Sequence, residues 1–222
     1  MADVEIEDWE AGISYEIERV VLKRGTDSCY VILDNGERFV INVDIVVGNV
    51  LEKGKEITGA ELAEILKKQR VITVKKDAYR IATNKPRSEF QMVQKLKERK
   101  YEQDEIALAI KFLYEFKLLN DLGFAKSFVA NKLITKRFGL SRMRIELKRT
   151  GVSKEVIDEA LASEFPNDEV EIFQLALEAA ERKLRLIANK DAVKKRNSMI
   201  QFLTRQGFTW KTINRVCEKI LN

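Results

Sequence analysis

The 222-residue sequence contains no histidine, and this absence excludes several kinds of chemistry. Histidine is the most frequent general base and metal ligand, so a Ser-His-Asp or Cys-His nucleophile cannot be built here. Two cysteines are too few for a Cys/His zinc site, and glycine-rich phosphate loops are also missing. We therefore predict no catalytic residues, no cofactor and no metal. An enzyme with a carboxylate-bound metal is the alternative left open, because Asp and Glu are plentiful.

Long apolar segments and export signals are lacking as well. No apolar run approaches the roughly 20 residues of a membrane helix, and the first ten residues are acidic rather than basic and then apolar. Cys29 and Cys217 lie far apart in apolar patterns, which is typical of reduced thiols in a core. We expect a cytoplasmic protein without membrane contact.

The first part of the chain has the residue pattern of β-strands. Strands are predicted for the β-branched and aromatic stretches ISYEIERVVLK (13–23), CYVIL (29–33) and ERFVINV (37–43). Asp34-Asn35-Gly36 separates the last two, and an Asn-Gly pair is a strong hairpin signal. The apolar run IVVGNVL (45–51) is interpreted as another short strand.

A helix start follows these strands. Thr58 and Glu61 have the spacing of a capping box, which predicts a short helix with Leu62 and Ile65 on one face. VITV (71–74) is interpreted as a last strand. The prediction for residues 1–76 is thus a small β-rich domain with one short helix.

From about residue 77 onward one spacing pattern of apolar residues occurs three times. Each copy has a methionine, a leucine four residues later and an isoleucine ten residues after the leucine, and the copies are 51 and 56 residues apart. The residues are Met92, Leu96 and Ile106; Met143, Leu147 and Ile157; and Met199, Leu203 and Ile213. Met and Leu at this spacing share a helix face, so these side chains are expected in the core.

A glycine or its substitute separates the two helices of each copy. Gly151 and Gly207 suit the left-handed residue after a helix end, while Lys100 stands at this position in the first copy. Ser153 and Thr209 are placed to cap the next helix. With a further helix before each pair, the unit is three helices of about 50 residues, which is typical of a curved helical array. The predicted fold is mainly α, with repeats at 77–119, 120–165 and 166–222.

Positive charge is concentrated in the helical part. Residues 1–76 carry 11 basic and 15 acidic residues, whereas residues 77–222 carry 29 and 20. A single charged run is often only a solvated helix face, but the surplus of the whole array favours a polyanionic partner. The candidate binding residues, chosen from charge alone, are Arg144 and Lys148 first, then Lys132, Lys136, Arg137, Lys194, Lys195 and Arg196. Phe208 and Tyr101 occupy the apolar position of the repeat and are expected to pack, while Trp210 is left open between packing and base stacking.

The ordered set of repeat segments resembles the RecX family, bacterial regulators of the RecA recombinase. The segments that carry the resemblance are KPRSEFQMVQKLKERKY (85–101), LNDLGFAKSFVANKL (119–133), GLSRMRIELKRTGVSKEVIDEAL (139–161) and QFLTRQGFTWKTINRV (201–216). The strand-rich start also resembles an N-terminal extension found in part of the family. Lys100, where glycine is usual, departs from the pattern.

The resemblance implies a non-enzymatic modulator of DNA repair and recombination. Family members lie along the groove of the RecA–DNA filament and typically suppress ATP hydrolysis, strand exchange and repressor cleavage. The expected partners are therefore the RecA filament and DNA, contacted through phosphates, and we expect a monomer. A general nucleic-acid-binding array that acts without RecA is the alternative.

Overall fold

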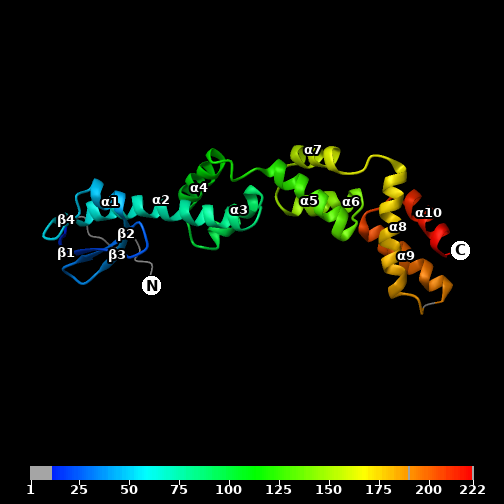
Figure 1. Cartoon of the computed structure of the whole chain (residues 1–222), viewed down its shortest axis with the longest axis horizontal. Coiled ribbons are helices and arrows are strands. Elements are labelled where there is room, and N and C mark those ends of the chain that lie inside the picture. Colours follow the sequence, from blue (N-terminus) through cyan, green and yellow to red (C-terminus); the bar gives the residue numbers. More distant parts are fainter. Residues whose placement is uncertain (1–11, 190, 222) are drawn as a thin grey trace. The chain divides into compact units, whose positions relative to one another are not determined.

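The computed structural model describes residues 12–189 and 191–221 (Figure 1). Its first part is a four-stranded antiparallel sheet in the order β3-β2-β1-β4. The strands are β1 (Ser14–Leu22), β2 (Ser28–Leu33), β3 (Arg38–Asn42) and β4 (Glu56–Thr58). The predicted hairpin turn is confirmed: Gly36 has a φ of 84° and its N–H donates to the Leu33 carbonyl at 3.0 Å.

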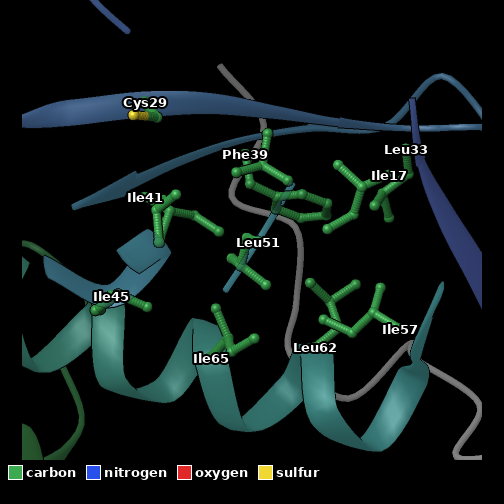
Figure 2. Close-up of a cluster of buried hydrophobic side chains, with 12 residues drawn as sticks. Ile17, Cys29, Leu33, Phe39, Ile41, Ile45, Leu51, Ile57, Leu62 and Ile65 are labelled. Atoms are coloured by element: carbon green, nitrogen blue, oxygen red, sulfur yellow. The ribbon is translucent and has the colours of Figure 1, made fainter. Parts of the chain in front are cut away.

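One face of this sheet is covered by two helices, α1 (Val43–Gly48) and α2 (Gly59–Asn84). Figure 2 shows Ile17 and Phe39 of the sheet pointing toward Leu62 and Ile65 of α2. Ile17 is fully buried and Leu62 is almost so. Burial of apolar surface between sheet and helix therefore stabilises this part of the chain.

The prediction of a strand at residues 45–51 is wrong, because helix α1 occupies most of that stretch. The Asn42 side chain accepts a hydrogen bond from the Asp44 N–H at 2.9 Å and so caps the helix. Ile45 is buried beneath the sheet while Val47 is 70% exposed, so the apolar run has a one-sided helical burial pattern.

The capping box at Thr58 is confirmed, but the helix that it begins is long rather than short. The Glu61 carboxylate accepts from the Thr58 N–H at 2.9 Å, and the Thr58 hydroxyl accepts from the Glu61 N–H at 3.2 Å. Helix α2 then continues for 26 residues, so the predicted strand at 71–74 is wrong. Val74, Ala78 and Ile81 are buried at helical spacing, and no glycine or proline interrupts the segment.

Within the described residues, 12–189 and 191–221, eight more helices follow and contain the three copies of the repeat. They are α3 (Glu89–Lys97), α4 (Gln103–Glu115), α5 (Asp121–Lys136), α6 (Leu140–Arg149), α7 (Lys154–Glu164), α8 (Glu169–Leu186), α9 (Ala192–Gln206) and α10 (Trp210–Leu221). All three methionines and leucines of the repeat are 0% exposed, and its isoleucines are at most 4% exposed. The mainly helical fold and the core role of these residues are therefore confirmed.

The residues that the structure describes fall into two compact units. One contains residues up to Ile81 together with Leu96–Phe112, and the other contains Ala82–Lys95 together with the chain from Leu113 onward. The predicted boundary between residues 76 and 77 falls inside α2, which is continuous there. The division into domains at 76, 119 and 165 stays a prediction.

Within the second unit, the start of α3 packs on the turn between α6 and α7; we call this contact the first joint. Ser88 is fully buried, and its hydroxyl donates to the Thr150 carbonyl and accepts from the Gln91 N–H at 3.2 Å. Phe90 lies against Gly151, where a Cβ atom would be 2.6 Å from the Phe90 Cδ1 and still closer to its Cγ. The first joint therefore requires a glycine in the turn.

The second joint places the start of α6 on the turn between α9 and α10. The Gly139 N–H donates to the Gln206 carbonyl at 2.8 Å. Gly207 lies against Arg142, where a Cβ atom would be 2.7 Å from the Arg142 Cβ and closer still to its backbone nitrogen. Ser88 and Gly139 each stand four residues before the repeat methionine, so both joints use equivalent positions.

Candidate polyanion-binding residues

The two first-ranked candidates lie on α6 in different electrostatic surroundings. Arg144 is paired with Asp158 of α7, and its guanidinium lowers the pKa of that carboxyl. Lys148 is exposed one turn later and has no ion-pair partner among the described residues. Met143 and Leu147 of the same helix face the core. Lys148 is thus available to a partner, whereas Arg144 would have to share or leave Asp158.

The candidates at the end of α5 also differ in exposure and in pairing. Lys136 is exposed in the last helical turn. Lys132 lies over the Phe128 ring, 5.2 Å from its centroid, and is half-buried. Arg137 follows the helix in the left-handed conformation and pairs with Glu178 of α8 at 2.6 Å, with only 16% of its side chain exposed. Arg137 therefore connects α5 to α8 and presents little surface to a partner.

The third group stands at the beginning of α9. Asp191 caps this helix by accepting from the Lys194 N–H at 2.8 Å, and the Lys194 ammonium pairs with the same carboxylate at 3.0 Å. Both contacts lower the pKa of Asp191. Lys195 is half-buried, and Arg196 is exposed and has no ion pair within the described part of the chain. Lys194 is thus partly neutralised, while Arg196 keeps its full charge.

The eight candidates are distributed over three helices of the second unit, and α6 contacts both α5 and α9. Ion pairs engage Arg137, Arg144 and Lys194, so that Lys136, Lys148 and Arg196 are the exposed cations of the set without an ion pair among the described residues. The pairs of Arg137 and Arg144 join different helices. Helical spacing predicts contacts three or four residues apart, so these two pairs could not be read from the sequence.

Charged groups also meet where the start of α3 contacts α4 and α5. The Asp121 carboxylate accepts from the Glu89 N–H at 2.7 Å, and the Tyr114 hydroxyl donates to the Glu89 carboxylate at 2.6 Å. Burial raises the pKa of Asp121, and the nearby Glu89 charge acts in the same direction. The Glu89 residue thus connects the start of α3 to α4 through Tyr114 and to the start of α5 through Asp121.

The two cysteines lie in two separate core clusters. Cys29 and Cys217 are buried free thiols, as predicted, and burial raises the pKa of Cys217. Within residues 12–189 and 191–221, no cluster of three or more Cys, Asp or Glu side chains could hold a metal ion. In the same residues no helix is long and apolar enough to span a bilayer.

Comparisons with protein families match the three helical segments in order. The models described as the first, second and third three-helix domains of RecX match residues 75–113, 120–161 and 169–217. The curated protein "Regulatory protein RecX" of Clostridium beijerinckii is 27% identical over 90% of this chain and 93% of its own length. The protein of the same name from Clostridioides difficile is 29% identical over 95% and 97%.

Solved structures show the same fold. The crystal structure of a regulatory protein RecX aligns with a TM-score of 0.69 over 92% of this chain and 99% of its own length, at 21% identity. The crystal structure of RecX from Lactobacillus salivarius aligns with a TM-score of 0.57 over 68% and 96%, at 19% identity. The first alignment covers nearly all of both chains.

Proposed function

Because the chain belongs to the RecX family of regulatory proteins, which modulate RecA and are not enzymes, we propose that it binds the RecA–DNA filament and inhibits RecA. The activities affected are ATP hydrolysis, strand exchange and coprotease cleavage. The observation that carries the proposal is the ordered match of all three helical repeats. It is supported by relatives that align over nearly the whole chain.

The charge distribution supports contact with DNA phosphates. The helical part has a surplus of nine positive charges, and Lys136, Lys148 and Arg196 are exposed without ion pairs among the described residues. Exposed cations attract a polyanion at long range and add contacts whose strength falls with salt. We propose these three as the principal phosphate contacts, with Lys132, Lys195, Arg144, Lys194 and Arg137 contributing less because they are half-buried or already paired.

The test measures the single-strand-dependent ATPase of RecA with the pure protein added below RecA's concentration. Inhibition at that ratio is expected, because a protein that lies along the filament affects several protomers at once. No inhibition at saturating concentration would reject the proposal. Tight, salt-sensitive DNA binding without any effect on RecA would favour the alternative, a general nucleic-acid-binding array.

Charge-reversal variants identify the surface involved. Changing Lys136, Lys148 and Arg196 together to Glu is expected to raise the half-inhibiting concentration about tenfold. The matched control reverses three exposed cations of the strand-rich part, Arg24, Lys53 and Lys68, and so changes the net charge equally. Equal loss of inhibition in both variants would show that net charge, rather than this choice of residues, controls binding.

A further inference from the structure

Trp210, at the beginning of α10, is a large apolar side chain that the fold does not bury. It is 62% exposed, whereas the neighbouring Phe208 is 8% exposed and belongs to the core of the third repeat. Packing therefore accounts for Phe208, as expected from the sequence, but it does not account for Trp210.

The other repeats show that this position needs no aromatic residue. Helices α4, α7 and α10 are the third helices of their repeats and begin at Gln103, Lys154 and Trp210. These positions are equivalent, since each lies seven residues after the repeat leucine. All three are exposed, and two of them carry polar residues. The tryptophan is therefore an addition that repeat packing does not require.

Cationic side chains follow Trp210 along the same helix. Lys211, Arg215 and Lys219 stand at four-residue intervals, about 6 Å apart along the helix axis. The Arg215 guanidinium lies 4.8 Å and the Lys219 ammonium 5.6 Å from the centroid of Phe173 of α8. Contact with this ring fixes both cations in a row that can follow successive phosphates of one strand.

Two glutamates partly neutralise the positive charge of Lys211, Arg215 and Lys219. Glu169 accepts from Lys211 at 2.6 Å and lies 3.8 Å from Arg215, and the Lys211 hydrogen bond lowers the pKa of Glu169. With Glu218 exposed on the same helix, the group keeps a net charge of about +1 at neutral pH. Lys211 adjoins Trp210 on the helix surface, whereas Arg215 and Lys219 lie farther around the helix, so the cationic row leads away from the indole. This arrangement suits a strand whose phosphates follow the row and whose base next to Lys211 reaches the indole.

We propose that Trp210 stacks on an unpaired base of single-stranded DNA while Lys211, Arg215 and Lys219 contact the adjoining phosphates. The choice of DNA as the partner rests on the proposed function, and the inference adds a base-stacking residue to it. Every base has an aromatic face, so this contact distinguishes single strands from duplex without reading sequence.

Tryptophan fluorescence tests the proposal directly, because the chain contains only Trp9 and Trp210. In full-length protein carrying Trp9→Phe, Trp210 is the sole tryptophan. Oligothymidylate is expected to quench its fluorescence, while a base-free sugar–phosphate oligomer of the same length should leave it unchanged. Quenching of equal size by the base-free oligomer would overturn the proposal, because phosphates alone would then explain it.

Affinity measurements with a labelled oligothymidylate supply the second arm. Trp210→Gln places the residue of the equivalent Gln103 position in the third repeat, so folding should be retained. It is expected to weaken oligothymidylate binding about tenfold and leave base-free binding unchanged, while Trp210→Phe should keep most of the affinity. Glu169→Gln, which frees Lys211 and Arg215, should strengthen binding about threefold. Equal affinity of Trp210→Gln and the parent protein would reject the stacking contact.

Adding RecA without DNA separates this inference from the proposed function. A response of Trp210 fluorescence to RecA alone, with none to oligothymidylate, would assign the tryptophan to a protein contact and overturn the proposal. In that case, undiminished inhibition of the RecA ATPase would leave the proposed function intact. Absence of inhibition by the parent protein would reject the proposed function, whatever the fluorescence shows.

Discussion

The turns after α3, α6 and α9 share one backbone conformation but differ in residue and in surroundings. Their φ angles are 60° at Lys100, 78° at Gly151 and 88° at Gly207. The two glycines lie in the joints, directly beneath the start of a helix from the preceding repeat. In the first of these turns the Arg70 guanidinium of α2 donates instead to the Lys100 carbonyl at 2.9 Å, and the Lys100 side chain is exposed.

This difference separates two reasons for glycine in a helical repeat. A left-handed φ costs an ordinary residue about 1 kcal/mol, which a fold can absorb. Close approach of the Phe90 side chain at Gly151, and of the Arg142 backbone at Gly207, leaves no room for a Cβ atom, and that cannot be absorbed without moving the neighbouring helix. Glycine is therefore required where repeats join, and the first turn tolerates lysine because it lies outside the two joints.

The largest effect is expected from Gly207→Ala, which should lower the free energy of unfolding by about 3 kcal/mol. About 1 kcal/mol comes from the positive φ, and the rest from the clash of the new methyl group with the Arg142 backbone. Urea unfolding followed by circular dichroism measures the change.

Gly25→Ala is the matched control for this experiment. Gly25 has a φ of 73°, but a Cβ atom at this position would have no heavy atom within 4 Å. The variant should therefore lose only the conformational cost of about 1 kcal/mol in its free energy of unfolding. If both variants lose the same stability, the second joint does not explain the glycine at position 207.

A second prediction compares a buried hydroxyl of the first joint with an exposed helix cap. Ser88→Ala should lower the free energy of unfolding by about 2 kcal/mol, since it leaves the buried Thr150 carbonyl and the Gln91 N–H without this partner. Ser153→Ala removes only an exposed helix cap, whose hydroxyl accepts from the Val156 N–H at 3.3 Å, and should cost about 1 kcal/mol. Urea denaturation of both variants checks the order. A smaller loss for Ser88→Ala would mean that water replaces the hydroxyl in the first joint.

The sequence predicted those parts of the fold that depend on local spacing. Met143, Leu147 and Ile157 were placed in the core by helical periodicity, and Asn35-Gly36 identified the hairpin. The failures at residues 45–51 and 71–74 concern short β-branched runs, in which a strand and a buried helix have the same composition. At 45–51 the Asn42 side chain caps α1, and the later part of α2 pairs through Arg70 with Glu105 and through Asp77 with Arg99, contacts that lie far apart in the sequence.

The candidate residues could be predicted only as charges. Arg144 and Lys148 look alike in the sequence, yet Arg144 is paired with Asp158 across two helices and Lys148 is exposed. Such pairs arise from tertiary packing and leave no local signal. The joints, too, are visible only in three dimensions, because Ser88 and Thr150 are 62 residues apart.

The smallest effect is expected at the turn that has no joint. Lys100→Gly should raise the free energy of unfolding by about 0.5 kcal/mol, because relief of the left-handed strain slightly exceeds the entropy that glycine adds to the unfolded chain. Lys100→Ala keeps the strain and removes the charge, so its urea midpoint should equal that of the parent protein. Destabilisation by both Lys100→Gly and Lys100→Ala would show that the lysine side chain itself stabilises the turn. The contrast with the two glycine turns would then lie in side-chain contacts rather than in the presence of a joint.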